Sequence, residues 1–158
     1  MDGKVRRESM TTMTELVLPN DANLIGNLLG GRLMHWIDIA GALAAGRHSD
    51  GIVATMTMDM VEFKRPVKVG DIVTLRSYVT WTGRTSIEVA VEVFSEDTLT
   101  GVRQFINKVY LVFVGVDKDG KKRPVPGLIP ETEEEKRECG QAMRRRERRL
   151  LIAKETEL

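Results

Sequence analysis

An aspartate within an apolar segment is the first residue of this chain that needs a chemical explanation. Asp38 stands between two isoleucines in the stretch GNLLGGRLMHWIDIAGALAA, which runs from Gly26 to Ala45 and is mostly small and apolar, as in a buried helix. A buried ionised carboxylate loses much solvation free energy unless a partner compensates it, and such carboxylates cluster at functional sites. We interpret Asp38 as a general base or a nucleophile. The alternative is a structural aspartate bonded to the backbone or to a partner chain.

Residues that could polarise a carbonyl group precede Asp38 in the chain. Gly30 and Gly31 fall at the expected start of the helix, where backbone N–H groups have no helical partner and can bind a developing oxyanion. Asn23, in the loop before them, could hold a water or a carbonyl group with its side-chain amide. The alternatives are that the glycines only let the chain turn into the helix, and that the asparagine serves a turn.

The spacing of these candidates predicts a site shared between two copies of the chain. Gly30 and Asp38 are eight residues apart, which is about 12 Å along a helix. An oxyanion donor and an attacking group must each lie about 3 Å from the same reacting group, so one helix cannot supply both. We therefore expect Asp38 of one copy to act with Gly30 of another across a two-fold axis.

Other kinds of site have less support in the sequence. His35 could form a proton-shuttling pair with Asp38, as a hydratase needs, but a histidine on a helix face more often serves structure. The sequence has no metal-ligand cluster, phosphate-binding loop or GxSxG motif. Arg84, on the hairpin TGRTS, could hold a phosphate or simply be an exposed turn residue. The run RRRERR at residues 144–149 resembles a nucleic-acid patch, but residues 131–158 are balanced in charge, so we interpret the run as a solvated helix face.

The elements that position these residues follow from periodicity. A long helix is expected from Gly31, because small and apolar residues recur at steps of three and four, and such a helix can be enclosed on several sides. His48 suits its C-terminal end, where the helix dipole favours a cation. Strands are expected at residues 9–18, 52–63, 72–81, 86–96 and 102–116, and a second helix at residues 133–153. This order predicts an α+β fold in which one antiparallel sheet curls around one helix.

Composition limits the partners of the protein. The chain has 158 residues, which suits one domain, and Lys+Arg 24 against Asp+Glu 23 leave no bulk field that would favour nucleic acid or an anionic membrane. The one cysteine excludes an intramolecular disulfide and a cysteine-based metal cage. No stretch approaches the ~18 apolar residues of a membrane span. We therefore expect a cytoplasmic protein without membrane insertion.

Several blocks of the sequence, taken in order, resemble one family. The blocks are NDAN, GNLLGGRLMHWIDIAGALAA, VATMTMDMVEFKRPVKVGD, WTGRTSIEVAVEV and FVGVDKDGKKRPVP. Over about residues 10–130 they resemble the hotdog-fold acyl-CoA thioesterases, specifically the bacterial acyl-CoA hydrolases related to the brain-type enzyme. The resemblance implies a hotdog domain at residues 1–130, with a five-stranded antiparallel sheet wrapped around the long helix, and a charged helical tail at residues 131–158. It also implies a homodimer joined edge to edge, and often a hexamer of three dimers.

The resemblance assigns roles to individual positions. Asp38 matches the family's catalytic acidic residue, Asn23 matches an asparagine that acts across the dimer interface, and Gly30 matches a backbone N–H donor to the thioester oxygen. Leu29 departs from the aromatic residue or histidine that many relatives have before the paired glycines, which leaves the acyl-chain preference open. The implied substrate-binding residues are Gly31, the strand residues Val53, Ala54 and Thr55 along the pantetheine arm, and the hairpin residues Gly83, Arg84, Thr85 and Ser86 near the nucleotide phosphates.

The implied reaction is hydrolysis of fatty acyl-CoA to a free fatty acid and CoA. It needs no metal and no cofactor, because coenzyme A is part of the substrate and the product. Two alternatives remain. One is a hotdog protein that binds acyl-CoA without cleaving it, and the other is a hotdog hydratase or dehydratase that would use His35.

Overall fold

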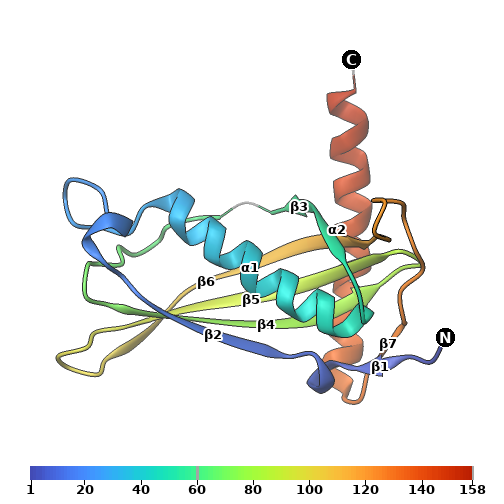
Figure 1. The fold of residues 1–158 in the computed structure, drawn as a ribbon, viewed down its shortest axis with the longest axis horizontal. Helices are drawn as coiled ribbons and strands as arrows, with labels where there is room; N and C mark the ends of the chain where they lie inside the picture. The colour runs from blue at the N-terminus through green and yellow to red at the C-terminus, as the bar shows by residue number, and fades with distance from the viewer. Residues whose placement is uncertain (60, 158) are drawn as a thin grey trace.

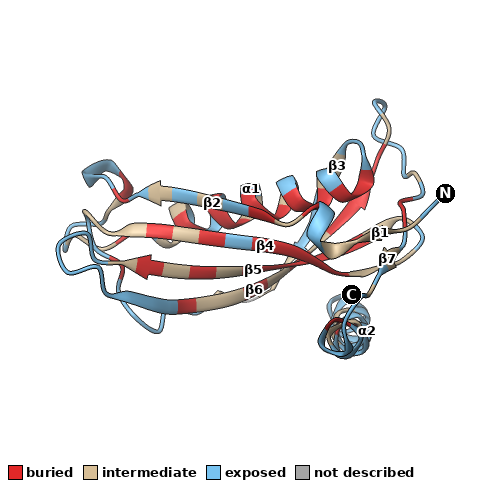
Figure 2. Ribbon diagram, turned by 90° about the horizontal axis from the view of Figure 1, so that it is seen from below, coloured by how far each residue is buried: buried red, intermediate tan, exposed pale blue. Residues whose placement is uncertain are grey.

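One antiparallel sheet with a helix on each face forms the body of the protein (Figure 1). The computed structural model describes residues 1–59 and 61–157. Helix α1, Gly30–Ser49, covers one face of the sheet, and helix α2, Glu133–Thr156, crosses the opposite face (Figure 2). The strands are hydrogen-bonded in the order β2 (Thr11–Leu16), β4 (Ile72–Thr82), β5 (Ser86–Glu96), β6 (Arg103–Gly115) and β3 (Val53–Met58). The predicted fold, with a five-stranded antiparallel sheet curled around one long helix and a C-terminal helix, is confirmed.

Short elements near the N-terminus and before α2 complete the fold. Strands β1, Lys4–Val5, and β7, Leu128–Ile129, form a two-stranded parallel sheet, which the sequence did not predict. The short 3-10 helices η1, Arg6–Glu8, and η2, Pro19–Asp21, precede and follow β2. Within residues 1–59 and 61–157, no helix combines the length and the apolar character needed to cross a membrane.

The alternation of side chains along β5 explains how one sheet can carry a helix on each face. Ile87, Val89, Val91 and Val93 are fully buried in the main core, on the side of α1. Glu88 lies between two of them in sequence and therefore points to the other face, where it contacts α2. An apolar residue at every second position thus places the core on one side of the sheet and charged contacts on the other.

Helix α1 buries one face against the sheet and leaves the other open. The buried face includes Leu33, Ile37, Ala40 and Ala44, all at 0% exposure. On the same face, a Cβ atom on Gly41 would lie 3.0 Å from the ring of Phe113, so the missing side chain lets α1 approach β6 closely. The open face includes Met34, Ile39 and Leu43, which are 44%, 38% and 41% exposed. In the single chain, the sheet therefore covers one side of α1 and leaves the other side exposed.

Strand β3 is shorter than predicted and contains a β-bulge. The predicted strand spans residues 52–63, but β3 ends at Met58, and Met60 lies outside the described residues. The pairing of β3 with β6 shifts between Thr55 and Thr57. A bulge adds one unpaired residue and so changes which face the following side chains meet. Thr55 contacts α1, whereas Thr57 lies beside α2, so β3 has side chains directed toward both helices.

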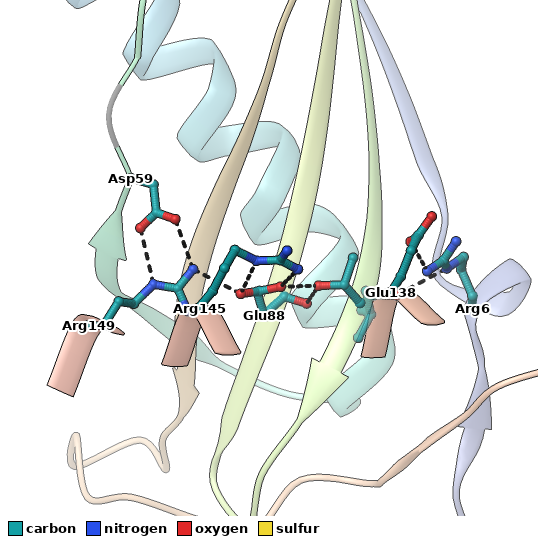
Figure 3. A network of polar contacts seen from close by, with 8 residues as sticks. Arg6, Asp59, Glu88, Glu138, Arg145 and Arg149 are labelled. Carbon is teal, nitrogen blue, oxygen red and sulfur yellow. Dashed lines mark hydrogen bonds and ion pairs between the residues drawn. The ribbon is translucent and has the colours of Figure 1, made fainter. Parts of the chain in front are cut away.

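Helix α2 is attached to the sheet by a network of charged side chains (Figure 3). Glu88, which is completely buried, accepts hydrogen bonds from Arg145 at 2.7 and 3.1 Å, from Arg149 at 2.9 Å and from the hydroxyl of Thr80 at 2.6 Å. Arg149 also donates to both carboxylate oxygens of Asp59, at 3.1 and 3.0 Å. The side chains of Arg145 and Arg149 are only 13% and 18% exposed. The interpretation of residues 144–149 as a solvated face is therefore wrong for these two arginines, because α2 lies on the sheet.

His48, near the C-terminal end of α1, is buried. Its Nε2 lies 2.8 Å from the carbonyl oxygen of Pro126, which can only accept, so Nε2 carries the proton. Nδ1 is buried and has no hydrogen-bond partner among residues 1–59 and 61–157. Burial lowers the pKa of His48 from its ordinary value of 6.5, although the hydrogen bond to Pro126 acts in the opposite direction. His48 thus lies in the last turn of α1 as expected, but its lost solvation outweighs the hydrogen bond to Pro126, so it binds a proton less readily than an exposed histidine.

Acidification is expected to destabilise the protein through His48. Below pH 6.5 the unfolded chain binds a proton at this residue that the folded chain resists, so the free energy of unfolding falls as the pH falls. His48→Gln, which keeps an N–H donor for Pro126, should flatten the dependence of the melting temperature on pH between about pH 7 and pH 5. The exposed His35 is the other histidine of the chain, and His35→Gln should keep the wild-type slope. An unchanged slope in His48→Gln would contradict the assignment.

Candidate active site

Asp38 lies on the open side of α1 and faces the edge strand β3. Its Oδ1 accepts a hydrogen bond of 2.7 Å from the hydroxyl of Thr55. Asp38 is half-buried in the single chain, so the expectation of a fully buried carboxylate is wrong. Within the part of the chain that the structure describes, Oδ2 has no hydrogen-bond partner in the protein. Thr55 therefore orients the carboxylate and leaves its second oxygen available to a water or a carbonyl carbon.

Asn23 and Gly30 line one hollow at the N-terminal end of α1. The hollow has a volume of about 300 Å³, and Phe63 also lines it. The side-chain Oδ1 of Asn23 accepts hydrogen bonds from the backbone N–H groups of Ile25 and Asn27, at 3.1 and 3.0 Å. The turn role that the sequence left as an alternative is thus present. Because Oδ1 is held by the turn, the Nδ2 group of the carboxamide is the end that can donate to a ligand.

Gly30 is the first residue of α1 and therefore has a backbone N–H without a helical acceptor. This end of the helix also carries the positive end of the helix dipole. A Cβ atom on Gly30 would lie 3.3 Å from the ring of Phe63, whereas a Cβ atom on Gly31 would meet nothing within 4 Å. Glycine at position 30 therefore lets the phenylalanine approach the N-terminal end of the helix. A carbonyl oxygen that develops negative charge would be stabilised there.

A single chain keeps the two groups of residues apart. Gly30 and Asp38 belong to the same helix and are eight residues apart, which corresponds to about 12 Å along its axis. Asp38 does not line the hollow at Asn23. Instead, it contacts β3, which is the last strand of the sheet and has one free edge. The expected division of the site between two copies remains a prediction that this geometry permits.

The candidate CoA-binding residues of β3 and of the hairpin gather at one end of the sheet, whereas Gly31 lies in the first turn of α1, at the other end of that helix. Ser86 pairs with Val114 on β6, and Val114 pairs with Ala54 on β3, so the three residues lie side by side. The hairpin before Ser86 is closed by a 2.9 Å hydrogen bond from the N–H of Gly83 to the carbonyl of Ser86. Arg84, at the tip of this hairpin, is exposed. The hairpin and the start of β3 are therefore neighbours, at the end of the sheet where α1 finishes.

Comparison with known proteins identifies the family. A family model described as "Thioesterase superfamily" matches residues 25–102. The uncharacterized acyl-CoA thioester hydrolase YkhA of Bacillus subtilis (strain 168) is 43% identical over 129 residues, which cover 82% of this chain and 75% of that protein. The chain belongs to the thioesterase superfamily. The predictions of a hotdog-fold acyl-CoA thioesterase family and of a thioester hydrolase are thereby confirmed.

Solved structures of thioesterases match this one along almost the whole chain. A structure described as an apo-hexameric acyl-CoA thioesterase is 42% identical, covers 97% of this chain and 98% of its own, and has a TM-score of 0.91. An acyl-CoA hydrolase from Staphylococcus aureus, in complex with butyryl coenzyme A, coenzyme A and coenzyme A disulfide, is 34% identical, with coverage of 98% and 94% and a TM-score of 0.89. Further structures of that hydrolase carry one aspartate, one asparagine or one threonine replaced by alanine.

The structure of this thioesterase also changes the reading of three site residues. His35 is exposed and makes no hydrogen bond to Asp38 within residues 1–59 and 61–157, so the histidine–aspartate pair of a hydratase is not formed. Thr55, expected only along the pantetheine arm, contacts the carboxylate of Asp38. Phe63 beside Gly30 was not predicted as a site residue. No local sequence signal marks the last two contacts, because each joins residues far apart in the chain.

Proposed function

We propose that this protein hydrolyses fatty acyl-CoA to a free fatty acid and CoA at two equivalent sites in a homodimer. The observation that carries the proposal is the position of Asp38, which is oriented by Thr55 at the free edge of β3 and lies about 12 Å along α1 from Gly30. When two copies join through their β3 edges, two-fold symmetry places Asp38 of each copy opposite Asn23 and Gly30 of the other. Each site is then complete only in the dimer.

The proposed chemistry uses the groups of both copies on one thioester. Asp38 either takes a proton from the water that attacks the carbonyl carbon, or attacks that carbon itself to form an anhydride that water then cleaves. The N–H of Gly30 and Nδ2 of Asn23 stabilise the carbonyl oxygen as it becomes negative. The carbon–sulfur bond then breaks and the sulfur leaves as a thiolate. A thiol pKa near ~8.5, as for cysteine, means that this leaving group needs little protonation, which suits a site without a histidine acid.

A relative supports the choice of residues. In this chain Asn23 and Asp38 are 15 residues apart, and Asp38 and Thr55 are 17 residues apart. The asparagine, aspartate and threonine replaced by alanine in the Staphylococcus aureus hydrolase have the same two spacings. Three residues chosen for substitution in that enzyme thus match Asn23, Asp38 and Thr55 of this chain in type and spacing.

The proposal extends to the rest of the substrate and to the assembly. The pantetheine arm lies along Val53 and Ala54, Gly31 lies beside the thioester, and the nucleotide phosphates lie near the hairpin residues 83–86, where Arg84 is exposed. The reaction needs no metal or cofactor besides the coenzyme A of its substrate. We also propose a cytoplasmic protein that binds neither nucleic acid nor membrane, and a hexamer of three dimers, which the hexameric relative supports.

Release of free thiol from acyl-CoA is the expected result for the purified wild-type protein. A panel of short, medium and long acyl-CoA substrates, followed with a thiol reagent, tests the activity and also measures the open acyl-chain preference. Hydration of crotonyl-CoA without thiol release would instead indicate a hydratase. Binding of acyl-CoA without either reaction would indicate a non-catalytic acyl-CoA-binding protein.

The two roles open to Asp38 can be separated by isotope labelling. A single turnover in oxygen-18 water places label on Asp38 if the carboxylate attacks the carbonyl carbon and water then opens the anhydride at the aspartyl carbon. If Asp38 is a base, label enters only the fatty acid. Mass spectrometry of the peptide that contains Asp38 distinguishes the two results.

A further inference from the structure

The side of α2 that faces the sheet continues beyond the sheet. Glu138, Ala142, Arg145, Arg149 and Ile152 recur at steps of four and three, so they share one side of the helix. The side chains of Glu138, Arg145 and Arg149 are 14%, 13% and 18% exposed. Ile152, the next member, is 58% exposed. Ile152, the large apolar residue on this side of α2, is therefore exposed in the single chain.

The position of α2 explains this exposure. In Figure 1 the helix runs across the strands, and its last turns extend past β3, the edge strand of the sheet. A hollow of about 750 Å³ lies at this edge, between Thr57 and Asp59 on the strand side and Ile152 and Ala153 on the helix side. Arg149, anchored to Asp59, fixes the direction in which the helix leaves the sheet. Ile152 thus lies beyond the last strand, on the side of α2 that faces the sheet.

The unpaired edge of β3 is exposed in the single chain. Residues 54–57 are exposed, and Met56 is 57% exposed. An exposed edge strand with apolar residues is a template for pairing with another strand. A strand that pairs with β3 extends the sheet in the direction in which α2 projects. The C-terminal end of α2 must then lie over the outer face of the strand that pairs with β3.

We propose that α2 of each copy clamps the other copy of the dimer, with Ile152 and Ala153 packed on the outer face of the second copy's β3. The inference rests on the edge-to-edge dimer of the proposed function and adds to it a second contact surface on the opposite side of the sheet from α1. Two-fold symmetry gives two such clamps per dimer. The clamp also gives Ile152, which is exposed in the single chain, an apolar contact in a helix that is otherwise strongly charged.

Two matched substitutions test the clamp. Ile152→Gln removes the apolar contact without adding a charge that could compete for Arg149. Leu150→Gln is the control, because Leu150 is 50% exposed in the single chain but lies about 200° away around the helix. The readout is subunit exchange between labelled and unlabelled protein, measured by native mass spectrometry. We expect exchange to be faster by about 10-fold or more in Ile152→Gln, because each dimer loses two buried isoleucines, and to be unchanged in Leu150→Gln.

The outcomes separate the clamp from the proposed function. Equal exchange rates in wild type and Ile152→Gln would overturn the clamp alone, provided that the wild type is dimeric and releases thiol from acyl-CoA. A monomeric wild type would overturn both the clamp and the shared site. If the wild type co-sediments with phosphatidylglycerol vesicles and Ile152→Gln does not, while exchange rates agree, the end of α2 binds lipid and the clamp is also overturned.

Discussion

Asp38→Asn is expected to lower kcat for acyl-CoA hydrolysis by about 10²–10⁴-fold, the usual contribution of a positioned base. The substitution keeps the size of the side chain and can still accept the hydrogen bond from Thr55, but it removes the negative charge that activates water or attacks the thioester. The KM for acyl-CoA should change little, because Gly30 and Asn23 still hold the carbonyl group. Steady-state thiol release and size-exclusion chromatography of the variant measure the rate and the assembly.

A matched control comes from the other end of the same helix. Asp50 follows α1 in the left-handed region, with φ of 55°, a conformation that asparagine also adopts readily. Its carboxylate is 71% exposed and pairs with Lys4. Asp50→Asn should therefore keep the wild-type kcat. Near-normal turnover in Asp38→Asn, or an equal loss in both variants, would remove Asp38 from the proposed chemistry.

Glu88→Ala is expected to lower the free energy of unfolding by about 3–5 kcal/mol, the range measured when one partner of a buried ion pair is removed. The completely buried carboxylate is the shared acceptor of Arg145 and Arg149, so its loss leaves Arg145 without a carboxylate partner at the sheet. Arg149 keeps Asp59. Burial alone would lower the pKa of Arg149. The hydrogen bonds to Asp59 and Glu88 and the charges of these carboxylates outweigh this effect, so the pKa of Arg149 is raised. Chemical unfolding at one fixed protein concentration measures the change.

Further variants test whether the unpaired charge of an arginine causes the loss of stability. Glu88→Leu combined with Arg145→Met removes both members of a buried pair, and it should be less destabilising than Glu88→Leu alone because no arginine is stranded. Glu133→Gln removes one member of an exposed pair with Lys136 on the same helix and should change stability very little. If the double variant is as unstable as the sum of its single substitutions, the network adds no coupling and the assignment fails.

Much of the architecture was predictable because its signals are local. The strand expected at residues 86–96 is β5, Ser86–Glu96, since alternating apolar and polar residues determine both its extent and its two faces. The start of α2 was also predicted, because Thr132 followed three residues later by Glu135 is a helix-capping pattern. In the structure the hydroxyl of Thr132 accepts a 3.1 Å hydrogen bond from the N–H of Glu135 and caps the helix. Strand β3 was predicted too long, because its bulge and its end depend on pairing with β6.

The candidate site was also predictable only in part. The residue types of Asn23, Gly30 and Asp38, and their spacing along the chain, were enough to suggest a carboxylate, a carbonyl-binding group and a site shared by two copies. The contact of Asp38 with Thr55 and the position of both at a free sheet edge could not be read from the sequence. These depend on which strand becomes the edge.

The sequence by itself determined the sheet, the central helix and the residues that can do chemistry, because periodicity and capping act within a few neighbouring residues. Only the tertiary structure decided that the charged C-terminal helix lies on the outer face of the sheet. It did so by joining Glu88 to Arg145, 57 residues away. A buried carboxylate such as Glu88 is stable only where a cation from another element lies beside it. Whether the two side chains come into contact depends on how the helix packs on the whole sheet.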